Sequence, residues 1–201
     1  MNESLFFEKM GFNVSRETFL KLETYVALLT KWQRAINLVS KNTLDKVWER
    51  HIFDSAQILK LIDKNNIADL GSGAGFPGMV IAILNPNFNI TLIESDSRKC
   101  EFLREVKRKC NVVNVSIFNE RIENLKEFSY DYVISRALAS LKELLILSQN
   151  ITNKDTKYVF LKGEKLQTEL EEVKEFFNLK YDIYNSITDI NGKIIKIQEV
   201  I

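Results

Sequence analysis

The chain has 201 residues, with 28 lysines and arginines, 27 aspartates and glutamates and one histidine, so its formal net charge is +1. This balance excludes a strongly basic or acidic chain, and the apolar runs fall far short of the roughly 20 residues that cross a bilayer. Hydrophobic residues make up 45%, enough to bury the core of one α/β domain, with or without a small appendage. No basic segment precedes a long apolar stretch at the N-terminus, so a cytoplasmic protein is expected.

The first 64 residues have the spacing of helices. Apolar residues recur every three or four positions from 16 to 36, which predicts an amphipathic helix with Ser15 as its N-cap. A second helix is expected over 43–61. Neither glycine nor proline occurs between Phe12 and Leu70, so we expect one continuous helical extension, residues 1–64, packed on the rest of the chain.

From residue 65 strands and helices alternate. Strands are predicted at 67–70, 89–94, 112–118, 130–135 and 157–161, and helices at 78–84, 98–110, 140–149 and 164–177. Two further strands, 180–187 and 193–200, flank the turn sequence "DING" and predict an antiparallel hairpin. The alternation indicates an α/β domain over 65–201, with a mostly parallel seven-stranded sheet and helices on both faces.

A cluster of basic residues lies in the helix predicted after the second strand. The segment "SRKCEFLREVKRKC" holds six cations and two acids, and is either a solvated helix face or a patch that faces RNA. Cys100 and Cys110 would lie about 15 Å apart along this helix, too far for a disulfide. Without paired cysteine or histidine spacing, no metal site is expected.

The stretch "DLGSGAGFPG" follows the first predicted strand, where doubly wound sheets bind their ligands. The dinucleotide pattern G-x-G-x-x-G fails when it is read from Gly71, because Phe76 stands where a small residue is needed. Read from Gly73 the pattern is satisfied, so NAD remains an alternative. A phosphate-binding P-loop is excluded, since no Lys-Ser or Lys-Thr pair follows the glycines.

Two acids favour another ligand. Asp69 precedes the loop, where a carboxylate would repel a pyrophosphate but attract a cationic amino-acid or sulfonium group. Glu94 ends the second strand, where an acid can accept hydrogen bonds from both hydroxyls of a ribose. Together with the glycines they resemble the cofactor site of S-adenosylmethionine-dependent methyltransferases. A dinucleotide site and a purely structural loop remain as alternatives.

Other residues limit the chemistry. No Pro-Pro turn follows the fourth strand, and both cysteines lie on the helix after strand two, so methylation of an amino group or of carbon 5 lacks its usual residues. Instead "SRALAS" places Arg136 at the mouth of strand four. A ring nitrogen with an in-plane lone pair, such as guanine N7, needs only alignment and exclusion of water. Arg136 could hold the guanine edge, a phosphate or the cofactor carboxylate, or form a salt bridge.

Seven motifs occur in a fixed order: "KWQRAINLVS", "ERHIFDS", "DLGSGAGFPG", "RKCEFLREV", "ERIE", "YDYVISRALASL" and "FLKGE". They resemble the glucose-inhibited division protein B family of bacterial 16S rRNA (guanine-N7)-methyltransferases over nearly the whole chain, least in the last 35 residues. The resemblance implies a Rossmann-like methyltransferase fold, S-adenosylmethionine as cofactor, and methyl transfer to N7 of a guanine in the decoding region of 16S rRNA. The implied partner is 16S rRNA or the small ribosomal subunit. A monomer is expected, without DNA or membrane.

The resemblance also indicates site residues. The cofactor contacts of the family fall on Gly71, Phe76, Ile122, Glu123 and Arg136, and the physical arguments add Asp69, Gly73 and Glu94. The candidates for substrate positioning are Arg136, Arg50, His51 and Lys162, and no side chain is required to act chemically. Departures from the family pattern are Gln33, where asparagine is usual, and the order Arg98-Lys99.

His51 is the only histidine, and Asp54 lies on the same helix face. They form either a structural network that docks the helical extension or, for His51 together with Arg50, a site that positions RNA. Lys162 is either a phosphate contact or a solvated lysine. Two other functions stay open: a nicotinamide-dependent oxidoreductase, which the scarcity of histidine disfavours, and a non-catalytic RNA-binding protein of the same fold.

Overall fold

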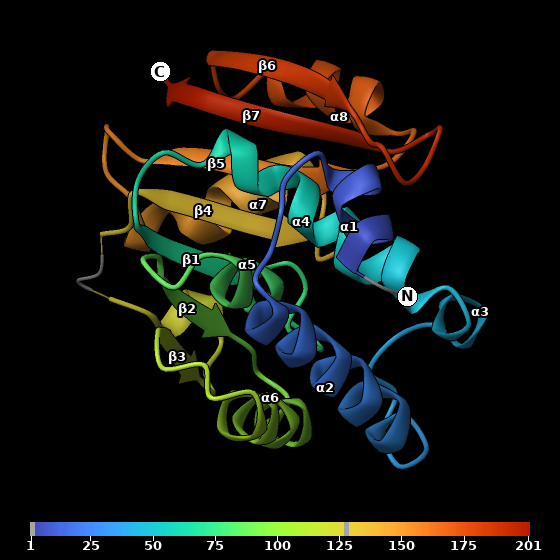
Figure 1. Ribbon diagram of the computed structural model, residues 1–201. Coiled ribbons are helices and arrows are strands. Elements are labelled where there is room, and N and C mark those ends of the chain that lie inside the picture. The colour runs from blue at the N-terminus through green and yellow to red at the C-terminus, as the bar shows by residue number, and fades with distance from the viewer. Residues whose placement is uncertain (1–2, 127–128) are drawn as a thin grey trace.

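The computed structural model describes residues 3–126 and 129–201. In these residues seven strands form one sheet in the order β3-β2-β1-β4-β5-β7-β6 (Figure 1). The strands are β1 (Asn66–Leu70), β2 (Asn89–Ile93), β3 (Val115–Phe118), β4 (Tyr132–Arg136), β5 (Lys157–Lys162), β6 (Leu179–Asn185) and β7 (Lys193–Val200). The first five are parallel, while β7 pairs antiparallel with both β5 and β6. The predicted sheet and its C-terminal hairpin are confirmed.

Helices cover both faces of the sheet. The α-helices are α1 (Glu3–Met10), α2 (Arg16–Trp32), α3 (Lys41–Leu44), α4 (Asp54–Ala56), α5 (Gly78–Leu84), α6 (Ser97–Lys109), α7 (Leu141–Ser148) and α8 (Leu166–Val173). A π-helical turn spans Trp48–Phe53, and 3-10 turns span Gln57–Leu61, Ile122–Asn124 and Gln149–Ile151. Two apolar clusters result, one packed on α1, α2, α5 and α6 and the other on α7 and α8. Successive strand residues alternate between them: Ile67 belongs to the first cluster, and Ala68 to the second.

The helical extension is less regular than predicted. Ser15 caps α2 as expected, because its hydroxyl accepts the Thr18 N–H at 3.1 Å. The helix, however, ends at Trp32 rather than 36. The side chain of Gln33 then donates to the Val39 carbonyl at 2.8 Å and accepts the N–H groups of Leu38 and Val39, which draws residues 33–39 into a loop.

The single helix predicted over 43–61 is wrong. Short α, π and 3-10 pieces take its place, and the prediction also omitted α1. Side-chain hydroxyls compete for the backbone in this segment: Thr43 donates to the Ser40 carbonyl at 2.7 Å, and Ser55 donates to the His51 carbonyl at 2.6 Å. The third strand begins at Val115 rather than at 112, because residues 110–114 form the turn that ends α6.

The predicted boundary between residues 64 and 65 does not divide the hydrophobic core into two. Phe19 and Leu29 of α2 lie in the same buried cluster as Val80 and Leu103 of the α/β part, so the two-part division stays a prediction. Both cysteines are buried free thiols, as their spacing predicts. Among the described residues, no helix combines the length and apolar character needed to cross a bilayer.

Candidate functional site

The glycine loop connects β1 to α5 in a backbone conformation that side chains rarely adopt. The φ angles are +62° at Gly71, +57° at Gly73 and +95° at Gly75. A Cβ atom on Gly73 would approach only the Gly71 carbonyl, at 3.8 Å, whereas one on Gly75 would lie 2.6 Å from the Tyr25 hydroxyl. Gly73 therefore keeps the space beside the loop free, and Gly75 permits close packing against α2.

A cavity of about 610 Å³ opens over this loop. It is lined by all but one of the residues predicted to bind the cofactor: Gly71, Gly73, Phe76, Glu94, Ile122, Glu123 and Arg136. The wall also includes residues that the sequence did not single out, namely Leu38, Val39 and Ser40 of the loop after α2, and Leu138 after β4. The structure thus brings together the predicted residues of four separate segments.

Asp69 is the exception. Its side chain is fully buried and does not line the cavity. One carboxylate oxygen accepts the Gly78 N–H at 2.9 Å, and the other accepts no hydrogen bond from any described residue. Burial raises the pKa of this carboxyl to about 7. Asp69 supports the first turn of α5, so it acts on a bound ligand only through the loop.

Asp69→Asn is expected to change how the free energy of unfolding depends on pH. The folded-state pKa of about 7 lies above the ordinary value of 3.8, so the ionised carboxylate costs stability that grows as the pH rises between these values. The cost is at most about 4 kcal/mol at pH 8. The variant should therefore gain stability relative to the native protein as the pH rises from about 4 to 8. Denaturant unfolding of both proteins across this range measures the difference, and a difference that does not vary with pH contradicts the assignment.

Glu94 joins the glycine loop to the turn after β2. Its two carboxylate oxygens accept the N–H groups of Gly73 and Asp96, both at 2.8 Å. The side chain is buried but lines the cavity. Because an ionised carboxylate can accept about four hydrogen bonds, Glu94 retains capacity for hydroxyl donors within the cavity.

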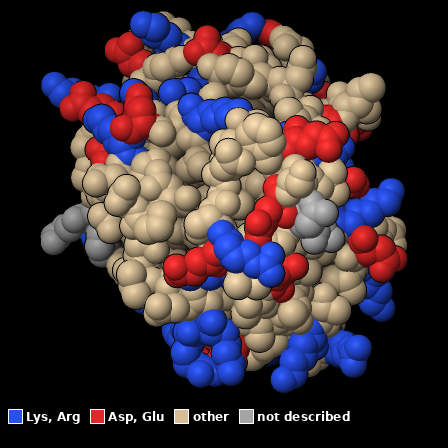
Figure 2. Space-filling model, in the orientation of Figure 1, with Lys and Arg blue, Asp and Glu red and all other residues tan. Residues whose placement is uncertain are grey.

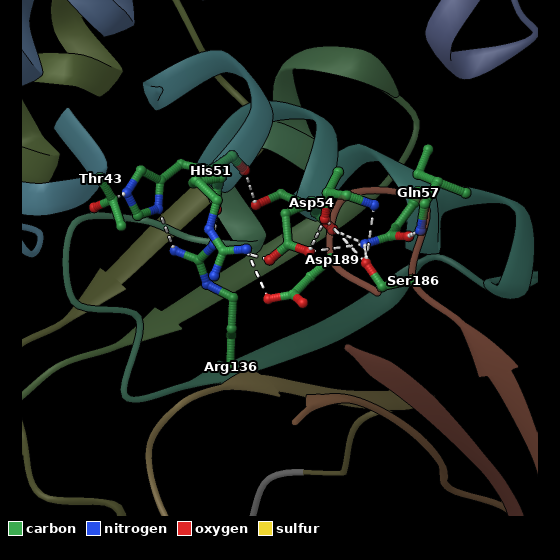
Figure 3. A network of polar contacts seen from close by, with 11 residues as sticks. Thr43, His51, Asp54, Gln57, Arg136, Ser186 and Asp189 are labelled. Atoms are coloured by element: carbon green, nitrogen blue, oxygen red, sulfur yellow. Dashed lines mark hydrogen bonds and ion pairs between the residues drawn. The ribbon is translucent and has the colours of Figure 1, made fainter. Parts of the chain in front are cut away.

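Arg136 is the centre of a polar network at the cavity wall (Figure 3). One terminal nitrogen donates to the Arg50 carbonyl at 2.9 Å and to the Asp54 carboxylate at 3.1 Å, and the other meets Nδ1 of His51 at 2.9 Å. A guanidinium only donates, so Nδ1 of His51 accepts, and the imidazole proton resides on Nε2, which donates to the Thr43 hydroxyl at 2.8 Å. His51 and Asp54 therefore form the predicted network, with Arg136 as their common partner.

The network fixes His51 as a neutral ring. Burial, together with the positive charges of Arg136 and Arg50, lowers the pKa of His51 to about 3. The lone pair of Nδ1 is occupied by Arg136. His51 is therefore unsuited to act as a general base.

Aromatic stacking ties the same residues to the glycine loop. The Phe76 ring stacks on His51, with centroids 4.9 Å apart, and on Tyr25, with centroids 5.3 Å apart. The Arg136 guanidinium lies 5.0 Å from the Phe76 centroid, within range of a cation–π contact. The hydroxyl of the fully buried Tyr25 donates to the Ala74 carbonyl. Sequence reasoning missed Tyr25 as a site residue, because its helical spacing is that of an ordinary core position.

A second cavity of about 960 Å³ adjoins the first. The two share a wall formed by Ser40, His51, Arg136, Ala137 and Leu138. The remainder of the second cavity includes Arg50 and other residues of the helical extension, the end of β5 with the segment that follows it, and residues of the turn between β6 and β7. All four residues predicted to position a substrate line this cavity: Arg50, His51, Arg136 and Lys162.

Lys162 is largely buried and paired within the protein, so it is not a solvated lysine, and its role as a phosphate contact stays a prediction. Its ammonium group lies 2.6 Å from the Glu169 carboxylate and donates to the Ala139 carbonyl at 2.8 Å, and its side chain is only 8% exposed. Glu169 also accepts the Leu141 N–H at 2.7 Å. The pair holds the loop that follows β4, and it uses two of the three N–H donors of Lys162 within the protein.

The turn of residues 186–192, here called the hairpin turn, docks on the helical extension. Thr188 donates to Asp54 at 2.7 Å, and the Gln57 side chain donates to the Ser186 hydroxyl at 3.1 Å (Figure 3). Arg50 forms an ion pair with Asp189 at 2.7 Å. The sequence predicts the turn but not this docking, which joins the last two strands to the Arg136 network.

Charged side chains of both signs lie on the face shown in Figure 2. Acidic and basic side chains are mixed over its upper and right-hand parts, and basic side chains gather along its lower edge. On α6, Arg104 and Arg108 pair with Glu101 and Glu105, as on a solvated helix face, whereas Lys99 lines the first cavity. Among the described residues, no group of three or more histidine, cysteine, aspartate or glutamate side chains is placed to hold a metal ion.

Comparisons with known proteins identify the family and the fold of the chain. The family model GidB, described as rRNA small subunit methyltransferase G, matches residues 19–198. Relatives of that name from Orientia tsutsugamushi (strain Ikeda) and Gluconobacter oxydans (strain 621H) are 46% and 44% identical, over 96% and 92% of this chain and 96% of each relative. The crystal structure of a SAM-dependent methyltransferase from Aquifex aeolicus has a TM-score of 0.60 at 12% identity, covering 76% of this chain and 93% of that one. This likeness confirms the predicted Rossmann-like methyltransferase fold, and the sequence matches show that the chain belongs to the rRNA small subunit methyltransferase G family.

Proposed function

We propose that the protein transfers a methyl group from S-adenosylmethionine to N7 of a guanine in the decoding region of 16S rRNA. The observation that carries the proposal is the pair of adjoining cavities, one over the glycine loop and one beside it, with Arg136 in their shared wall. A methyl donor in the first cavity and a nucleotide in the second would lie next to each other at these shared residues. The names of the relatives supply the class of RNA.

The first cavity suits the parts of the cofactor. Beside Gly73 a Cβ would meet nothing closer than 3.8 Å, so the loop backbone is accessible to a ligand. Glu94 has capacity for ribose hydroxyls, and Ile122 and Glu123 offer an apolar surface and an acid for adenine. Three of the five N–H donors of Arg136 are used within the protein, so two remain for a carboxylate.

S-adenosylmethionine, when bound, supplies a sulfonium methyl group that is already activated. N7 of guanine carries no proton, so no side chain has to remove one. The residues of the shared wall therefore act by alignment and by exclusion of water. A reaction that needs no general base agrees with a neutral His51 whose Nδ1 already accepts a hydrogen bond from Arg136.

The test is methylation with labelled S-adenosylmethionine. Small subunits and naked 16S rRNA from a bacterial strain that lacks the enzyme are incubated with the protein, and cleavage at N7-methylguanine locates the mark. We expect label at one guanine in at least one of the two forms. Label in neither form, together with intact RNA binding and no binding of S-adenosylmethionine, would instead favour a non-catalytic RNA-binding protein.

A further inference from the structure

Arg50 and Asp189 lie in the part of the second cavity that is not shared with the first. They come from opposite ends of the chain, Arg50 from the π-helical turn and Asp189 from the hairpin turn. Their ion pair is 2.7 Å long, and the side chains remain 41% and 34% exposed. The second cavity thus has a fixed donor and a fixed acceptor side by side in its wall.

Neither side chain is saturated. The bond to Asp189 is the one side-chain hydrogen bond of Arg50 within the described part of the chain, so most of its five N–H donors are available. Asp189 accepts from Arg50 with one oxygen and from the Asn191 N–H, at 3.0 Å, with the other. The hydrogen bond from Arg50 lowers the pKa of Asp189, which keeps the carboxylate ionised. Both groups can still bind a ligand.

Guanine has a matching edge. On its six-membered ring the O6 acceptor stands beside the N1–H and N2–H donors, whereas N7 belongs to the five-membered ring at the other side of the base. A base whose N7 faces the cofactor cavity directs its N1 and N2 groups away from it, into the unshared part of the second cavity. Adenine has the reverse pattern, so its N1 lone pair would oppose a carboxylate.

Resting on the function proposed above, we propose that Arg50 and Asp189 read the Watson–Crick edge of the target guanine, with Asp189 accepting from N1–H and N2–H and Arg50 donating to O6. The acceptor is held in place by its surroundings. The Gly192 N–H donates to the Asp189 carbonyl at 3.0 Å, the Ile187 N–H donates to the Gln57 side chain at 2.9 Å, and Thr188 donates to Asp54. Such fixation is what discrimination between bases requires.

The test compares guanine with inosine, which lacks only the 2-amino group. Small subunits are reconstituted with 16S rRNA that carries either base at the methylated position. We expect kcat/KM of the native protein to favour guanine by roughly ten- to a hundredfold, the discrimination that one good base contact supplies. In Asp189→Ala and Asp189→Asn this ratio should fall towards one. Asp189→Asn keeps an oxygen for the Asn191 N–H, so it preserves the turn.

A control variant and a binding measurement separate recognition from structure. Asp182→Asn changes an exposed aspartate of the same hairpin, outside both cavities, and should keep the native ratio. The affinities for the two RNAs, measured with S-adenosylhomocysteine present, should show the same preference. If the Asp189 variants slow both RNAs equally and leave the ratio unchanged, Asp189 has only a structural role and the inference fails. If the native protein methylates both RNAs alike, the inference also fails, although the proposed function stands; if it methylates neither, as reconstituted subunits and as naked rRNA, the proposed function itself fails.

Discussion

Arg136→Ala is expected to reduce methyl transfer by about a hundredfold or more, and to weaken binding of S-adenosylmethionine. The change leaves Oδ2 of Asp54 and Nδ1 of His51 without their donor, while Oδ1 of Asp54 keeps Thr188, in a wall where Arg136 and Asp54 are only 17% and 19% exposed. Breaking a fully buried pair costs about 3–5 kcal/mol, which is an upper bound for this partly exposed pair. The loss is measured as kcat/KM on small subunits and as cofactor affinity by calorimetry.

Two controls make this prediction specific. Arg136→Lys keeps the charge but cannot donate to three acceptors at once, so intermediate activity is expected. The single histidine gives an independent signal, since its NMR titration belongs to one residue. The positive charge of Arg136 contributes to the low pKa of His51, so Arg136→Ala should move that pKa part of the way back towards 6.5, with burial still lowering it. An unchanged titration would show that the network does not form in solution.

Gly75→Ala is expected to destabilise the protein by about 3 kcal/mol or more. The added methyl group would lie 2.6 Å from the Tyr25 hydroxyl and 2.9 Å from side-chain atoms of both Leu103 and Met79. These distances are shorter than van der Waals contact, so the methyl group would overpack the site, and a φ of +95° adds backbone strain. Denaturant unfolding measures the loss directly.

The same substitution elsewhere provides matched comparisons. Gly73→Ala meets no atom closer than 3.8 Å, so it should cost only about 1–2 kcal/mol of backbone strain while it obstructs the cofactor cavity. Binding of S-adenosylmethionine should therefore weaken more than stability does. Gly163→Ala has no described atom within 4 Å and should leave both properties close to native. Equal destabilisation by all three variants would contradict the assigned roles of the two loop glycines.

The sheet was predictable because its signals are local. Each parallel strand is a short apolar run bounded by a loop, and an α-helix follows four of the five, so the type of each element follows from the local pattern. The helical extension was harder to predict, because side-chain hydrogen bonds interrupt its helices. Gln33 binds the loop 33–39, and the Ser55 hydroxyl binds the His51 carbonyl. Neither bond has a periodic signature.

That seven of the predicted cofactor residues line one cavity was predictable for a similar reason. Its residues lie at the ends of strands, where the topology of a parallel sheet brings them together, and the family resemblance supplied Ile122 and Glu123. Asp69 shows the limit of this reasoning, because its position in sequence did not reveal that the carboxylate points beneath the loop. Lys162 and Asp189 show the same limit of reasoning from sequence position. Their roles depend on Glu169 and Arg50, which are distant in sequence and whose proximity only the folded chain reveals.

The docking of the hairpin turn has a consequence for biosynthesis. All residues that line the first cavity lie between positions 38 and 147, so they are synthesised before any residue of the turn. Arg50 and Asp189 are separated by 139 residues, and closing so long a loop is a late event in folding. A nascent chain can thus complete the cavity proposed for the methyl donor first. The cavity proposed for the nucleotide is finished only when synthesis nears its end.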